Sequence, residues 1–135
     1  MQAITPMLTY EDGASAMDWL ARAFGFTEII RMVEEDGSLG HGELQVGDAI
    51  LMLAGPPGYT STLRHRQTCE TERTAYDNPW AIDGVLVAVE NVDEHCARAK
   101  AAGARIVRGP ETTEHGRLYT AEDLEGHRWM FMQQS

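Results

Sequence analysis

The residues of this chain best suited to chemistry are a histidine and a glutamate two positions apart, His41 and Glu43. Side chains two apart on a β-strand point to the same face, so we expect the imidazole and the carboxylate to meet. They could form a hydrogen-bonded polar pair, or half of a metal site that His127 completes only by pointing to the same place. Hydrogen bonding within or at the rim of the sheet is the simpler interpretation.

Other reactive side chains have plain structural interpretations beside functional ones. His65, between Arg64 and Arg66, could receive a ligand carboxylate or phosphate, or could be ordinary exposed loop charge. Cys96 falls within a predicted helix as a small buried hydrophobe, with His95 on the solvent side. The strings GxGxxG, GxxxxGK[ST], GxSxG and HExxH do not occur, so the sequence does not support a nucleotide-binding, serine-hydrolase or zincin function.

The run GRLYTAEDLEGHRWMFMQ, residues 116–133, is typical of a β-hairpin, because two apolar-aromatic stretches flank a short turn that contains Gly126. Alternation along the second strand puts Trp129 and Phe131 on one face, where a helix should cover them. The other face of that strand then carries Arg128, Met130 and Met132.

The first half of the chain has the pattern of a βαβββ module. Asp12 predicts the start of a helix and Gly25 its end. An Asp36-Gly37 pair predicts a hairpin turn, and Pro6 favours an edge position for the first strand. The predicted strands cover residues 4–10, 26–34, 39–46 and 49–53.

The second half repeats this pattern at a nearly constant distance. Asn91 lies 79 residues after Asp12, and Gly126 lies 79 residues after Gly47. Such a register indicates an internal duplication. The predicted fold class is α+β, with module 1 at about 1–54, module 2 at about 83–135, and a single domain over 1–135. The linker loop 55–82, rich in proline, glycine and polar residues, is predicted to lack regular structure and to connect the modules or cover a ligand.

Composition narrows the classes of partner. The 21 acidic against 11 basic residues give a net charge of −10, which argues against nucleic-acid binding and is compatible with attracting a cationic small molecule. No apolar run approaches the ~20 residues that span a bilayer, and no secretory signal is visible. Cys69 and Cys96 are expected as reduced thiols in the cytoplasm.

Four segments carry a family resemblance: Glu11-Asp12, the helix segment with Trp19-Leu20 and Phe24-Gly25-Phe26, His41-Gly42-Glu43-Leu44, and EDLEGHRWMF at 122–131. With the duplication, they resemble the vicinal oxygen chelate superfamily of glyoxalase I, extradiol dioxygenases and bleomycin-resistance proteins. The resemblance covers essentially the whole chain. It implies that the two βαβββ modules are paired into a curved mixed sheet or half-barrel.

Superfamily members that use a metal are expected to carry a His or Glu ligand on the first and last strand of each module. The resemblance places these positions at Thr5, about Gly84, Leu51 or Met52, and Met130. Threonine hydroxyl and methionine thioether do not supply the ligands that Zn²⁺, Ni²⁺, Mn²⁺ or Fe²⁺ require. We therefore predict no metal and no other cofactor, and a binding protein in preference to an enzyme.

The resemblance then favours the bleomycin-resistance branch, in which the chain sequesters an aromatic or cationic compound as a homodimer. Methionines adapt to irregular ligands, although they could also fill an ordinary core. Tyr119 and Trp80 are the aromatic groups expected to stack on the ligand. No catalytic residue is predicted. The predicted ligand-binding residues are Thr5, Met7, His41, Glu43, Met52, Trp80, Tyr119, Arg128, Met130 and Met132.

Two alternatives come from other classes of protein. The first is a lyase, isomerase or dioxygenase with a displaced metal site built from His41, Glu43 and His127. The second is an interaction module whose long loop docks a partner protein.

Overall fold

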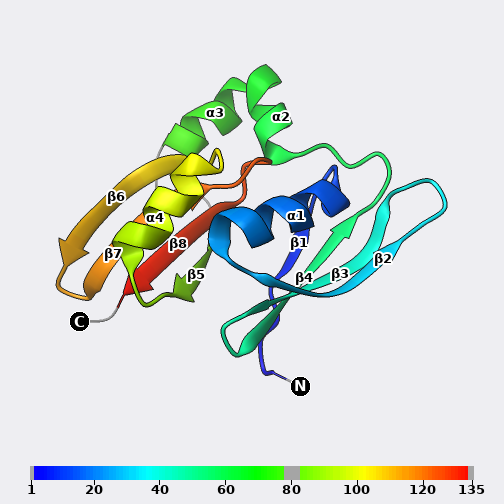
Figure 1. Cartoon of the computed structure of the whole chain (residues 1–135). Helices are drawn as coiled ribbons and strands as arrows, with labels where there is room; N and C mark the ends of the chain where they lie inside the picture. Colours follow the sequence, from blue (N-terminus) through cyan, green and yellow to red (C-terminus); the bar gives the residue numbers. More distant parts are fainter. Residues whose placement is uncertain (1, 78–82, 134–135) are drawn as a thin grey trace. The chain divides into compact units, whose positions relative to one another are not determined.

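The computed structural model describes residues 2–77 and 83–133 of the chain (Figure 1). They belong to two compact units, Met1–Ser61 and Thr62–Ser135. Each unit contains one four-stranded mixed sheet, in the orders β1-β4-β3-β2 and β5-β8-β7-β6. No described helix is long and apolar enough to cross a membrane. The predicted α+β class and the two βαβββ modules are confirmed, while the interpretation of 1–135 as a single domain stays a prediction.

The first unit follows the predicted order of elements. Asp12 caps α1 by accepting a hydrogen bond from Ser15 N at 3.0 Å, and Gly25 ends it with φ of 78°. Strand β1 is shorter than predicted because only three of its residues pair with β4, and it lies at the sheet edge, as Pro6 indicated. The elements are β1 (Met7–Thr9), α1 (Gly13–Phe24), β2 (Thr27–Val33), β3 (Leu39–Val46) and β4 (Ala49–Gly55).

The core of the first unit lies between α1 and one face of its sheet. Leu44, Leu51 and Leu53 point from the strands toward the helix and are almost completely buried. Gly42 lets the helix approach closely, because a Cβ there would lie 2.6 Å from Met17 Sδ. The helix contributes Met17, Trp19, Leu20 and Phe24. The prediction that Trp19 belongs to the core is confirmed.

The second unit repeats the arrangement with a longer third strand. Asn91 caps α4 by accepting from Glu94 N at 3.1 Å, as predicted. Strand β6 continues beyond the predicted residues 105–107, because its pairing with β7 shifts register around Gly109-Pro110 without ending. The elements are β5 (Gly84–Ala88), α4 (Val92–Ala101), β6 (Arg105–Thr113), β7 (Gly116–Glu122) and β8 (Arg128–Gln133).

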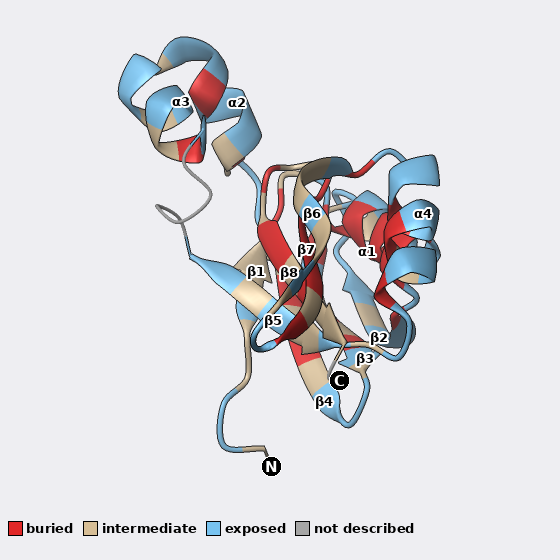
Figure 2. Ribbon diagram, turned by 90° about the vertical axis from the view of Figure 1, so that its left-hand side faces the viewer, coloured by how far each residue is buried: buried red, intermediate tan, exposed pale blue. Residues whose placement is uncertain are grey.

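The core of the second unit lies between α4 and the facing side of β7 and β8. Trp129, Phe131 and Tyr119 are completely buried there, with Tyr119 and Phe131 stacked at 5.1 Å between ring centroids. Cys96 is buried on α4, as predicted, and burial raises the pKa of its thiol. Figure 2 shows the buried side of α4 turned toward this sheet.

Two helices occupy a segment that the sequence predicted to lack regular structure. They are α2 (Thr62–Thr68) and α3 (Glu70–Asp77). Their apolar positions are too few to give a helical stripe, so periodicity did not reveal them. Arg66 is buried, whereas the His65 side chain, for which exposed loop charge was one interpretation, is 54% exposed beside Glu72.

Candidate functional site

The face of the first sheet turned away from α1, its far face, carries four of the ten predicted ligand-binding residues, Met7, His41, Glu43 and Met52. Strand pairing aligns Met7 with Met52, Met52 with Glu43, and Glu43 with Ile30, so these four side chains form one row across all four strands. Thr5 lies two residues before β1, outside the paired strand. The structure therefore brings Met7, Met52, Glu43 and His41 together on one face.

His41 and Glu43 meet on this far face as a polar pair. His41 Nε2 lies 2.7 Å from Glu43 Oε2, and the two side chains are 37% and 19% exposed. A carboxylate bonded to one imidazole nitrogen fixes the orientation of the ring and leaves its other nitrogen for a ligand or a proton. The predicted pairing of the two side chains is confirmed.

Two apolar residues on the same face were not predicted as ligand contacts. Met32 lies opposite His41 and is 57% exposed, and Ile30 lies opposite Glu43 and is 39% exposed. Both are on β2, whose partners depend on the register that the Asp36-Gly37 turn sets. Alternation within β2 together with that turn could have placed them beside the histidine and the glutamate.

The far face of the second sheet, turned away from α4, carries the remaining methionines. Met130 lies between Leu86 on β5 and Thr120 on β7, and Met132 lies one row further along. Leu86 is 60% exposed at the sheet edge, and it was not predicted. Its position is equivalent to that of Met7 in the first module, since each pairs with the methionine of its own last strand.

Arg128 shares this far face but is buried and engaged with other protein groups. Its Nη2 donates to Tyr76 O at 2.9 Å and lies 3.8 Å from Glu122 Oε2. Arg128 was predicted to contact a ligand, but its guanidinium group contacts other protein groups instead. The long arginine side chain reaches Tyr76 on α3 and Glu122 on β7, and its charge is held by these groups.

Tyr119 was predicted to stack on a ligand, but its ring faces α4. It is completely buried, and its hydroxyl lies 2.6 Å from His95 Nδ1. Burial raises the pKa of the phenol above its usual range. His95, expected on the solvent side, is therefore half-buried against the core. Trp80, the other predicted aromatic contact, lies outside the described residues.

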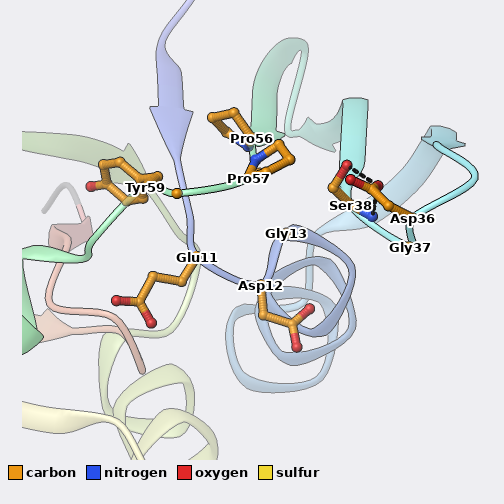
Figure 3. A pocket seen from close by; sticks show the side chains of 11 residues that line it. Glu11, Asp12, Gly13, Asp36, Gly37, Ser38, Pro56, Pro57 and Tyr59 are labelled. Atoms are coloured by element: carbon orange, nitrogen blue, oxygen red, sulfur yellow. Dashed lines mark hydrogen bonds between the residues drawn. The ribbon is translucent and has the colours of Figure 1, made fainter.

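A pocket of about 360 Å³ also lies in the first unit, at the start of α1. Three carboxylates contribute to its lining, but each already accepts hydrogen bonds: Asp12 from Ser15, Asp36 from Ser38, and Glu11 from Ser61 N. The bonds from Ser38 lower the pKa of Asp36. Figure 3 shows Glu11 and Asp12 pointing away from the Asp36–Ser38 turn, so the carboxylates do not converge on one ligand.

The positions where the resemblance expects metal ligands now have definite surroundings. Leu51 is buried toward α1, so Met52 is the residue of β4 that occupies the far face. Met130 occupies the far face of the second sheet. Within the described part of the chain, no three or more His, Cys, Asp or Glu side chains are grouped so that they could hold a metal ion. The residues at these positions do not fit a divalent cation.

The sequence profile of the Glyoxalase/Bleomycin resistance protein/Dioxygenase superfamily matches residues 4–131. The chain belongs to this superfamily. The match includes both modules and the whole of the β7–β8 turn. It confirms the family resemblance, which rested on the duplication and on the run EDLEGHRWMF.

Individual members show the same relationship. The uncharacterized protein Rv0887c of Mycobacterium tuberculosis is 30% identical over 132 residues, which cover 94% of this chain and 71% of that protein. The crystal structure of TioX from Micromonospora sp. ML1 is 32% identical over the full length of both chains, with a TM-score of 0.70. TnmS3, an antibiotic-binding protein from Streptomyces sp. CB03234, is 21% identical over both full chains, with a TM-score of 0.62, and shares the fold.

Proposed function

We propose that this glyoxalase-superfamily chain binds and sequesters a small aromatic or cationic organic compound without a metal, as a protein of antibiotic resistance. We place the ligand on the far face of the first sheet, which carries Met7, Met52 and the His41–Glu43 pair. Flexible methionines supply an adaptable apolar surface, and the His41–Glu43 pair supplies a polar group that orients the ligand.

One observation supports this proposal above the others. At two of the positions where a metal-using relative is expected to carry ligands, Met52 and Met130 lie on the far faces. Thioethers are poor ligands for the divalent metals of this superfamily but good partners for aromatic rings. The antibiotic-binding description of TnmS3 is compatible with this function on the same fold.

Calorimetric titration against bleomycin and against a planar aromatic cation tests the proposal. We expect saturable binding with at least one of these compounds, weakened about tenfold by Met52→Lys, because a cationic side chain then replaces the adaptable thioether. Ala49→Lys is the matched control, since it adds the same charge to an exposed position of the same strand. Absence of heat at about millimolar concentrations, where even weak complexes form, would exclude sequestration of these compounds.

The His41–Glu43 pair favours one alternative, a lyase, isomerase or dioxygenase with a displaced metal site. The two side chains belong to the first unit, whereas His127, the third predicted ligand, belongs to the second unit. Metal analysis of untagged protein separates the two functions. Stoichiometric Ni, Zn, Mn or Fe that survives dialysis, and is lost in His41→Ala, would replace the binding function with the enzymatic one.

We further propose that the chain acts as a homodimer in the cytoplasm. Exposed apolar residues on the far face of the first sheet, such as Met7 at 76%, favour association with a second copy. Cys69 and Cys96 are free thiols in the structure, which is compatible with a reducing compartment. Sedimentation velocity at tens of micromolar should give a dimer, and a monomer at that concentration would contradict the proposed homodimer.

A further inference from the structure

Glu122, the last residue of β7, is a buried carboxylate surrounded by arginines. Its side chain is 2% exposed. Arg66 Nη1 lies 2.9 Å from its Oε2, and Arg105 Nη1 lies within hydrogen-bond distance of its Oε1. Arg128 Nη2 is 3.8 Å away. A buried carboxylate is stable only when such partners replace its water, so this cluster forms as a unit.

The partners of Glu122 come from different elements. Arg105 belongs to β6 and Arg128 to β8, whereas Arg66 belongs to α2. The Arg66 guanidinium also lies over the Tyr76 ring, 4.0 Å from its centroid, and Arg128 donates to Tyr76 O. One carboxylate therefore connects the sheet to both helices of the α2–α3 hairpin, residues Thr62–Asp77.

A second contact fixes the beginning of α2 on the turn after Glu122. Leu63 N and Thr62 Oγ1 both donate to Glu125 O at 3.2 Å. Gly126 adopts φ of 90°, and a Cβ there would lie 2.9 Å from Thr62 Oγ1. The helix thus packs directly against a turn that only glycine allows.

The α2–α3 hairpin has few other buried side chains that could fix its position. Among the described residues of the two helices, Arg66 is the buried one on α2 and Tyr76 the buried one on α3. Helices of seven and eight residues are not stable by themselves in water. Figure 2 shows both helices mostly exposed, with small buried patches. Their order therefore depends on the Glu122 cluster.

This cluster lies on the far face of the second sheet. Glu122 pairs with Arg128, and alternation along β8 puts Arg128 on the same side as Met130. The hairpin consequently contacts Glu122 and Arg128 at one end of the surface that presents Met130. We propose that Glu122 is a positioning residue that anchors α2–α3 there and limits access to the far face. Neither the anchoring nor the access to Met130 rests on the proposed function.

Hydrogen exchange followed by peptide mass spectrometry tests the anchoring without a ligand. Glu122→Gln and Arg66→Met should each raise amide exchange in residues 62–77 by about tenfold or more, with β7 and β8 still protected. Arg117→Gln is the matched control, because it removes an arginine of the same unit that pairs with Asp93 instead of with Glu122. Unchanged exchange in 62–77, or an equal rise throughout Thr62–Ser135, would overturn the proposal.

A second measurement reads access to the far face. In Met130→Cys protein, maleimide labelling at position 130 is followed by mass spectrometry, which separates it from Cys69 and Cys96. Adding Glu122→Gln should accelerate this labelling about tenfold, because the open state of the hairpin becomes more populated. Labelling that stays slow while exchange in 62–77 rises would show that the hairpin does not control access. Failure to find any ligand would affect the proposed function alone.

Discussion

Asp123 satisfies three donors at the turn between β7 and β8. Its Oδ1 accepts from Glu125 N and His127 N, and its Oδ2 accepts from the indole of Trp129, each at 3.0 Å. Asp123→Ala leaves these groups without the carboxylate, so the free energy of unfolding should fall by about 2–4 kcal/mol in urea titrations. Glu114→Ala, in an exposed turn, should change it by less than about 0.5 kcal/mol. Similar losses for both variants would contradict this role.

Tyr119 should make stability depend on pH in the alkaline range. The phenol is buried with a raised pKa, so the folded protein keeps its proton where an exposed tyrosine, with a pKa of about 10, loses it. This stabilisation is complete below about pH 10 and is lost as pH rises further, by up to about 1.4 kcal/mol per pH unit. Urea unfolding of Tyr119→Phe should show a shallower decline above pH 10. Parallel curves for the two proteins would exclude the effect.

At the scale of one strand, successive side chains of β4 point alternately to the core and to the far face. Leu51 is buried against α1, and its neighbour Met52 points the other way. Leu51→Ala should cost about 2–4 kcal/mol of unfolding free energy, because a cavity forms in the core. Met52→Gln should cost at most about 1 kcal/mol, since that position is half-exposed. Thermal and urea unfolding of both variants measure the difference, and the reverse order would mean that the faces are exchanged.

Elements with strong local signals could be predicted from the sequence. Asp12 and Asn91 as caps, Gly25 as a helix end and the repeated spacing of the modules specify local geometry, which neighbouring residues decide. The resemblance left the β4 position open between Leu51 and Met52, and the structure puts Leu51 in the core and Met52 on the far face. Alternation within β7 does not reveal which face of the strand α4 covers. The prediction that Tyr119 stacks on a ligand was therefore wrong, because its side chain is buried in the core.

The α2–α3 hairpin shows where such prediction ends. Its helices are polar, and their order depends on Arg66, which contacts a carboxylate 56 residues later in the chain and lies over the Tyr76 ring. No local sequence pattern indicates that Arg66 or Tyr76 is buried, and arginine in particular is normally exposed. Contacts of this range are visible only once the strands are placed. For the same reason Arg128 was assigned to a ligand when it contacts Glu122 and Tyr76.

For the whole molecule, the net charge of −10 predicts how a cationic ligand arrives. A negative surface accelerates the encounter with cations, and salt screens this attraction over about 10 Å at 0.1 M. Raising NaCl from about 0.02 to about 0.5 M should slow association of a planar aromatic cation about tenfold in stopped-flow fluorescence. A neutral analogue of the same shape is the control. Equal salt dependence for both would mean that surface charge has no part in capture.

The pairing of first with last strand in each module has a consequence for synthesis on the ribosome. Strand β1 pairs with β4, so the first sheet can close while the second half of the chain is still being made. Strand β5 pairs with β8, so it has no neighbour until translation reaches Arg128. A nascent chain that stalls before that codon exposes an unsatisfied strand edge to other chains. Slow translation of the codons for β8 should therefore favour aggregation more than slow translation between the two modules.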